Sequence, residues 1–385
     1  MLKNILLFII LAVILQADMD FRVENSNYSI SQGSVVPNID KRYEYNYDRL
    51  RVRGDYTQDN FFATFIGDGV NYYGKTYVNS KDFGYIQLQE SDTPFRTKTN
   101  PHTYSNGVSF AKIYRAYGGY EDDKNRVVVG LQNISMGVGL VWNPTNTFNP
   151  RNTYAIEPDE TFGVAGVSYT RHLNDTSHAR VVASQKEDKS FKYAGQYKAF
   201  IDFADIGIDI ISSDTTKMLG YELEANLADT GIEVRSKGAY IKNRLYKDAL
   251  HLQTEDVEFF QGIVGANYGF TNGISLVFEA LYSSQDFSYE DILINYDSEI
   301  LTKLVYSKFY TALNLSYTFN IFLDGSLTYI ESFNDENSRF VSPTLIYTLN
   351  DYNSFILGAM LLGGRDTSEF GMLENTYFFK YTLSF

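Results

Sequence analysis

Three arginines, Arg49, Arg51 and Arg53, are spaced two residues apart. In a regular strand this spacing places all three side chains on one face, because successive side chains point to opposite faces. Acidic groups facing such a basic ladder would create an electric field that sorts polar solutes by charge and dipole. The alternative is that carboxylates of the same wall pair with the arginines, which then have no role in selectivity.

A second charged group, Glu157, Asp159 and Glu160, follows a segment of unusual composition. That segment, residues 137–150, holds Trp142, which is the single tryptophan of the chain, and two Asn-Pro steps. A residue before proline prefers extended geometry and Asn-Pro favours turns, so we expect an ordered loop. Its length allows it to fold inward as a constriction whose acidic side faces the arginines. An outward-facing cap is the alternative.

Groups for catalysis or metal binding are sparse, with no cysteine and four histidines in the chain. His102 and His251 lie in polar segments typical of loops, whereas His172 and His178 flank a tight turn. None stands beside a serine in a pattern that indicates nucleophile activation. An acid–base site around His251 is the alternative. We expect a protein without catalytic residues, metal site or cofactor.

The elements that carry these groups follow a period of two. Near the carboxyl end, Tyr377, Phe379, Tyr381 and Leu383 alternate with more polar residues, and the sequence ends at Phe385. An amphipathic strand that finishes on an aromatic residue resembles the last strand of bacterial outer-membrane β-barrels. The resemblance implies that Phe385 is an insertion signal and that the barrel-insertion machinery is a partner.

The amino terminus predicts export. Lys3 precedes an apolar run from Ile5 to Leu15, and the small residue Ala17 follows. This pattern is typical of a secretory signal peptide covering residues 1–17, which leaves 18–385 as a single transmembrane domain. Beyond it we find no stretch of the roughly 20 apolar residues that a transmembrane helix needs, so a mature chain that spans a membrane must be a barrel. A single-pass anchor is the alternative for residues 1–17.

Alternating strands recur along the chain, joined in turn by tight turns and by longer polar loops. This connectivity predicts an all-β fold, a transmembrane antiparallel up-and-down β-barrel. Counting back from the last strand gives about 17 strands. The segment around Phe21 to Ser31 supplies one more, which makes about 18, with about 16 as the fallback. In such barrels the tight turns lie on the periplasmic side and the long loops outside.

The same parity separates lipid-facing from lumen-facing side chains. Tyr43, Tyr45 and Tyr47 share the parity of the three arginines, so either a bulge near Asp48 resets the register or these rings line the mouth. So many inward charges favour a water-filled interior, because an unpaired charge in a dry core is costly. A plugged barrel in which these groups pair is the alternative. Besides the arginines, the basic residues expected in the lumen are Lys192, Lys198, Arg235, Lys237 and Lys308. The acidic residues expected there are Asp205, Asp209, Glu222, Glu224, Glu233, Glu279 and Asp324.

Together these patterns resemble porin-like barrels of Gram-negative bacteria. The resemblance implies a place in the outer membrane, contact with its lipid and lipopolysaccharide, and a homotrimer as one assembly to test. We expect a channel for passive diffusion of small hydrophilic solutes, since a barrel of about 16 to 18 strands is wide enough to hold water. A carrier of hydrophobic compounds and a surface-binding or structural barrel are the alternatives. The net charge of -14 argues against nucleic acid as a partner.

Overall fold

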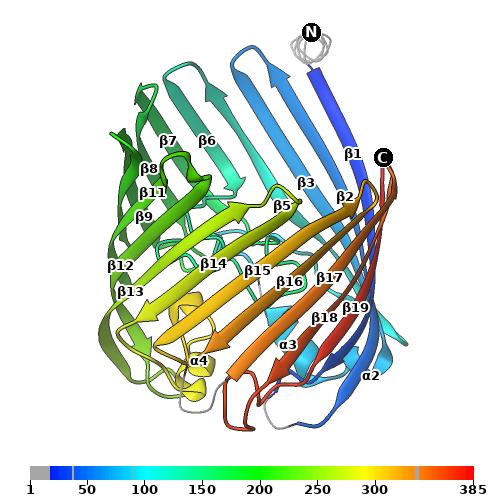
Figure 1. Ribbon diagram of the computed structural model, residues 1–385. Helices are drawn as coiled ribbons and strands as arrows, with labels where there is room; N and C mark the ends of the chain where they lie inside the picture. The colour runs from blue at the N-terminus through cyan, green and yellow to red at the C-terminus, as the bar shows by residue number, and fades with distance from the viewer. Residues whose placement is uncertain (1–17, 37–38, 89, 334–337) are drawn as a thin grey trace.

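The computed structural model describes residues 18–36, 39–88, 90–333 and 338–385, so the expected signal peptide lies outside the described residues. The strands form one antiparallel sheet that closes on itself where β1 pairs with β19 (Figure 1). In chain order they are β1 (Asp18–Gly33), β2 (Arg42–Gln58), β3 (Phe61–Tyr73), β4 (His102–Tyr104), β5 (Gly107–Glu121), β6 (Asn125–Gln132), β7 (Val164–Asn174), β8 (Ser177–Gln185), β9 (Phe191–Ile201), β10 (Ala204–Ser212), β11 (Thr216–Asn226), β12 (Ile232–Tyr246), β13 (Thr254–Gly269), β14 (Ile274–Ser283), β15 (Phe309–Asn320), β16 (Leu323–Ser332), β17 (Ser338–Asn350), β18 (Asn353–Gly363) and β19 (Thr376–Ser384).

Among the described residues, eighteen of these strands make up the wall, and the three-residue β4 is an addition that pairs with β5 at its rim. The predicted all-β barrel of about 18 strands is therefore confirmed, and β1 is the strand expected around Phe21 to Ser31. The helices are short: α2 (Lys75–Val78), α3 (Lys81–Leu88), α4 (Tyr289–Ile294), η1 (Ala228–Thr230) and η2 (Leu301–Lys303). Within the described part of the chain, no helix is long and apolar enough to cross a membrane.

The two ends of the barrel differ in their connections (Figure 1). Tight turns, the start of β1 and the end of β19 lie at one end, while α2, α3 and α4 lie in long loops at the other, which we call the outer end. The β8–β9 and β10–β11 connections, residues 186–190 and 213–215, are also at the outer end and are short. Loop length is therefore uneven around the outer rim.

Side chains alternate across the wall as the sequence pattern requires. On β10, Ile208 and Ile210 are 52% and 57% exposed on the outer surface, whereas Asp209 between them is fully buried on the inner face. β-branched residues suit this position, because they pack well on a pleated surface and bring apolar area to lipid.

The pairing of β2 with its neighbours shows on which face the tyrosines that precede Asp48 lie. β2 pairs with β1 and with β3 in continuous register. The alternative of a bulge near Asp48 is therefore wrong, and Tyr45 lies on the same inner face as Arg49. The Tyr45 ring stacks on Tyr77 of α2 with centroids 3.7 Å apart. The tyrosines at the outer end are thus covered by the loop that contains α2.

β6 ends before it reaches the outer end of the barrel, and β4 and residues 97–99 lie beside β5 there instead. Its last pairings with β5 join Ala116 to Leu131, while the outer half of β5 pairs with β4 and with the strand-like residues 97–99. Near the end of β6, Gly130 has a φ of 129° and a Cβ there would collide with the Ala116 carbonyl oxygen. Glycine is therefore required where the chain leaves the wall. The following residues are free to enter the lumen.

Candidate functional site

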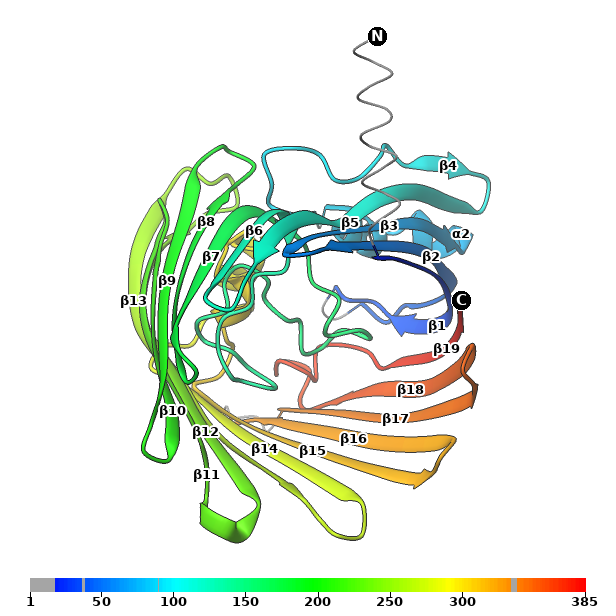
Figure 2. The same cartoon turned by 90° about the horizontal axis from the view of Figure 1, so that it is seen from above.

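The connection between β6 and β7, residues 133–163, folds into the barrel and crosses its interior (Figure 2). We call it the inner loop. It contacts Glu279 on β14, Asp209 on β10 and Arg49 on β2, which lie on different sides of the wall. The inner loop is thus held across the lumen by charged side chains of several strands.

Glu279 holds the inner loop by its backbone. Its carboxylate accepts hydrogen bonds from the amides of Leu140, Val141 and Trp142 at 2.7, 3.1 and 3.0 Å. Glu279 itself is completely buried, with Arg235 at 3.8 Å. A carboxylate that accepts several amide hydrogen bonds makes strong, charge-assisted contacts. Three consecutive residues of the loop are therefore fixed by one side chain.

Further polar contacts secure the residues that follow. The Thr145 hydroxyl donates to Asp209 at 3.0 Å, and Lys237 pairs with the same carboxylate at 3.0 Å. Lys303 donates to the Asn143 carbonyl at 2.6 Å, and Lys192 donates to the Thr147 carbonyl at 3.1 Å. These lysines come from β9, β12 and the loop between β14 and β15. The Asn-Pro segment predicted to be ordered is therefore held from three directions.

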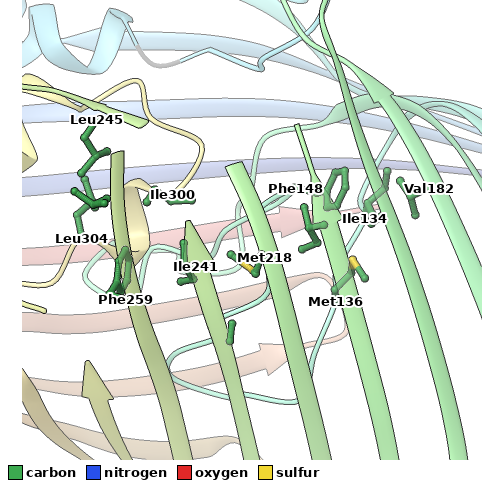
Figure 3. Close-up of a cluster of buried hydrophobic side chains, with 14 of the residues drawn as sticks. Ile134, Met136, Phe148, Val182, Met218, Ile241, Leu245, Phe259, Ile300 and Leu304 are labelled. Carbon is green, nitrogen blue, oxygen red and sulfur yellow. The ribbon is translucent and has the colours of Figure 1, made fainter. Parts of the chain in front are cut away.

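An apolar cluster joins the inner loop to the wall (Figure 3). Ile134, Met136 and Phe148 of the inner loop pack with Val182 and Met218 of the wall. The outer β14–β15 loop adds Ile300 and Leu304 against Leu245, Ile241 and Phe259. The apolar residues on this part of the inner face are covered by the two loops, so they form no open apolar track within the described structure.

Trp142 lies in a separate aromatic group. Its ring is 5.9 Å from that of Tyr310 on β15. Tyr154, further along the inner loop, contacts the rings of Phe340 and Phe370 at centroid distances of 5.4 and 5.2 Å. The inner loop thus also rests against β15, β17 and the outer β18–β19 loop.

The acidic end of the inner loop meets the arginines directly. Glu157 pairs with Arg49 at 2.9 Å and with Lys380 on β19 at 2.8 Å. Both oxygens of Glu160 accept from Arg51, at 2.8 and 2.9 Å. The sequence predicted acidic and basic groups facing each other across a passage, whereas the structure brings Glu157 and Glu160 into ion pairs with Arg49 and Arg51.

Wall carboxylates share the same arginines. Arg51 also makes a two-pronged contact with Asp68 on β3, at 2.7 and 2.9 Å. Arg49 lies 3.5 Å from Glu24 on β1. Arg49 and Arg51 therefore each have one acidic partner on the wall and at least one on the inner loop. The alternative in which wall carboxylates pair with the arginines accounts for the wall partners alone.

The acidic residues of the inner loop have perturbed proton affinities. Burial raises the pKa of Glu160, but the hydrogen bond from Arg51 and the charges of Arg49 and Arg51 outweigh it and hold this pKa at about 2. Burial likewise opposes the charges of Arg49 and Lys380 at Glu157, whose pKa is lowered below its ordinary value. Both carboxylates are therefore ionised at neutral pH.

Other residues singled out from the sequence lie apart from this contact. Arg53 pairs with Asp55 on its own strand. Asp159 is 85% exposed and pairs with Arg151 inside the inner loop at 3.2 Å. Lys308 lies just before β15 and pairs with Asp286 of the outer loop at 3.5 Å, both more than half exposed. The structure therefore brings together two of the three arginines and two of the three acidic residues.

The remaining charged residues group on β9 to β14 and on β16. Lys237 and Lys198 approach Glu222 at 3.4 and 3.6 Å, and Arg235 lies 3.8 Å from Glu233. Three further carboxylates lie on the inner wall with part of their surface exposed: Asp205, Glu224 and Asp324. The residues that are almost fully buried are those that hold the inner loop or its neighbours: Lys192, Asp209, Glu222, Arg235, Lys237 and Glu279.

A basic chamber lies between the start of the inner loop and the short-turn end. It has a volume of about 410 Å³, and its lining includes Arg115, Arg126, Arg180 and His178, with no acidic residue among the described lining residues. Arg115 donates to the Thr161 carbonyl at 2.8 Å. The sequence reasoning missed these arginines because they stand singly on β5, β6 and β8. Arg126 and Arg180 stand two residues from other inward residues of their strands, which was the available signal, whereas Arg115 faces inward beside Tyr114 at an irregularity in the pairing of β3 with β5.

The chamber adjoins the ion pairs of the inner loop through one ring. The ring centroid of Tyr114 lies 4.0 Å from the guanidinium of Arg51 and 4.1 Å from that of Arg115. Cation–π contacts of this kind fix the orientation of a guanidinium group. No group of three or more His, Cys, Asp or Glu side chains in the described residues is arranged to hold a metal ion.

No family model and no curated protein matches this chain. Solved structures match it along almost its whole length. OccAB1 of Acinetobacter baumannii has a TM-score of 0.62 and 11% identity, with 96% of this chain and 95% of that chain covered. The outer membrane protein OpdK of Pseudomonas aeruginosa has a TM-score of 0.56 and 9% identity, with 96% and 98% covered. Together with the closed eighteen-strand wall, these likenesses show that the chain has the fold of a Gram-negative outer-membrane porin.

Proposed function

We propose that this protein is an outer-membrane channel for passive diffusion of small hydrophilic solutes. The observation that carries the proposal is a charged inner wall in a closed barrel, crossed by a loop that narrows the lumen. The fold is shared with OccAB1 of Acinetobacter baumannii and with the outer membrane protein OpdK of Pseudomonas aeruginosa, which supports the proposal. The proposed activity is transport without catalysis, and exposed Phe385 at the end of the last strand is the proposed insertion signal.

The basic chamber favours small anionic solutes. Arg126 and Arg180 line a space large enough for a small organic molecule, and the described lining carries positive charge alone. Guanidinium groups recognise carboxylates and phosphates through paired hydrogen bonds. The similar OpdK has also been solved with vanillate. Solute charge, rather than apolar surface, is therefore the proposed basis of selection.

A planar bilayer experiment tests this function. The refolded mature protein should give discrete conductance steps, and the reversal potential under a salt gradient should show a preference for anions. Neutralising Arg126 and Arg180 together as glutamines should move the reversal potential toward cation preference, because the chamber loses two charges.

Arg244 provides the matched control, since it lies near the outer end of β12 and pairs with Asp256 on the neighbouring strand. Arg244→Gln should leave selectivity close to that of the unmodified protein. Silence from protein that has folded, as judged by heat-modifiable mobility on a gel, would contradict the channel proposal. Equal shifts for Arg244→Gln and for the chamber variant would contradict the role of the chamber.

A further inference from the structure

The inner loop contains a short segment, residues 155–160, that is attached differently from the rest. We call it the strap. Each of its residues keeps part of its surface exposed, whereas Ile134, Met136 and Thr145 earlier in the loop are at most 1% exposed. The strap contacts β2 and β19 through the side chains of Glu157 and Glu160, and its Ile156 packs against the wall cluster that includes Tyr28.

Both ends of the strap are fixed. Before it, Tyr154 is held between Phe340 and Phe370. After it, the Thr161 carbonyl accepts from Arg115 at 2.8 Å. Six residues reach at most about 20 Å when extended, which limits any movement of the strap to the space between these two points.

Release of the strap leaves its arginines with partners. Arg51 keeps its two-pronged contact with Asp68, and Arg49 keeps Glu24 nearby. Stranding a buried charge without a partner is strongly unfavourable, and for Arg49 and Arg51 the wall carboxylates prevent it, while Lys380 keeps its contact with the Tyr28 ring. The ion pairs of the strap are therefore suited to reversible opening.

An anion in the basic chamber lies close to these ion pairs. Tyr114 contacts both Arg51, the partner of Glu160, and Arg115, which lines the chamber. A negatively charged solute that leaves the chamber along this ring meets a guanidinium already bound to a carboxylate of the strap. The solute and Glu160 would then compete for the same donors.

We propose that the strap is a gate in which Glu157 and Glu160 occupy the donors of Arg49 and Arg51, and that a small organic anion opens the gate by exchanging with these carboxylates. The proposal rests on the proposed channel function. It adds that the carboxylates of the protein act as internal competitors of the solute, so that opening is coupled to the presence of an anion.

Single-channel recording of a matched pair of variants tests the gate. Glu160→Gln removes the charge that binds Arg51, while Asp159→Asn removes a charge one residue away that is 85% exposed and paired within the loop. Glu160→Gln should raise the ratio of open to closed time about ten-fold, equivalent to ~1.4 kcal/mol. Asp159→Asn should leave the ratio unchanged.

Competition by an anion is tested with succinate as the probe. At constant ionic strength, replacing chloride by succinate should lengthen the openings of the unmodified protein. The Glu157→Gln, Glu160→Gln double variant should be open already and show no further response. An increase of similar size in the double variant would place the effect of succinate elsewhere and overturn the exchange.

The outcomes separate the gate from the channel. If folded unmodified protein and the double variant are both silent, the channel function fails and the gate fails with it. If the unmodified protein conducts and Glu160→Gln behaves like Asp159→Asn, the gate is wrong while the channel stands. Heat-modifiable mobility of every variant checks that the barrel has formed.

Discussion

The two halves of the inner loop, the segment before Tyr154 and the strap, are held to the wall by different kinds of contact. In the first half, charged side chains of the wall bind backbone groups of the loop, as Glu279 does with three consecutive amides. In the strap, charged side chains of the loop bind charged side chains of the wall, as Glu160 does with Arg51. Apolar burial supports the first half, because Ile134 and Met136 are almost inaccessible to solvent.

This difference indicates which part of the inner loop is rigid and which part can move. Backbone contacts and buried apolar surface are lost only when the loop leaves the wall as a whole, so they fix a shape. Ion pairs between side chains can exchange one partner for another, and Arg51 already has carboxylates on both the wall and the strap. The same loop can therefore narrow the lumen permanently at one part and reversibly at another.

The largest effect is expected when the first half loses its main contact. Glu279→Gln keeps the shape of the side chain but removes the charge that three amides share, and hydrogen bonds to charged groups are worth roughly 1.5–3 kcal/mol each. We expect the inner loop to become at least about ten-fold more susceptible to protease, which corresponds to ~1.4 kcal/mol. Limited proteolysis of the folded barrel measures this. Glu233→Gln is the control, because Glu233 is partly exposed and accepts from the Asn267 side chain.

Acidification should act on the strap. The pKa of Glu160 is lowered to about 2 in the folded protein, from an ordinary value of 4.5. A depressed carboxyl pKa contributes stability above the unfolded value that is lost as the pH falls toward the folded value. We therefore expect open time to rise as the pH falls from about 4.5 to 2. The Glu157→Gln, Glu160→Gln double variant should lack this rise, and a rise of the same size there would assign it to other groups.

A smaller effect is expected at the boundary between the two halves. Tyr154→Ala removes two aromatic contacts, each worth about 0.5–1.5 kcal/mol beyond burial. We expect more frequent brief closures and openings in single-channel traces, because the strap loses its first fixed point while Glu279 keeps the earlier residues in place. Tyr85, 44% exposed on α3, is the control position. Identical traces for Tyr154→Ala and the unmodified protein would show that the boundary lies elsewhere.

The smallest effect is expected at Arg53. Its partner is Asp55 on the same strand, and its side chain is 43% exposed. Arg53→Gln should leave open time unchanged and shift the reversal potential less than the change at Arg126 and Arg180. A large change in open time would break the distinction between arginines that hold the strap and an arginine that does not.

The barrel was predictable because its signals are local. An alternation of period two in each strand, as at Tyr377, Phe379 and Tyr381, depends on neighbours along the chain alone, and strand number follows by counting. The confirmed parts are the all-β class, the antiparallel barrel of about 18 strands and its likeness to outer-membrane porins. The pore-lining roles of the charged residues stay predictions.

The partners of the charged residues were not predictable in the same way. Parity places Arg51 on the inner face, but its contact with Glu160 depends on the path of a loop more than 100 residues away in sequence. The inward turn itself depends on residues 97–104 taking the place of the outer half of β6, which requires knowledge of non-local pairing. The basic chamber likewise collects Arg115, Arg126 and Arg180 from three strands.

The pairing of β1 with β19 has a consequence for assembly. Lys380 lies on the final strand and pairs with Glu157, while Arg49, the other partner of Glu157, lies on β2. These two cations become neighbours when the last strand reaches the first, so a barrel whose seam is open offers Glu157 half of its binding site. The strap therefore has its full set of contacts only in a barrel whose first and last strands are paired.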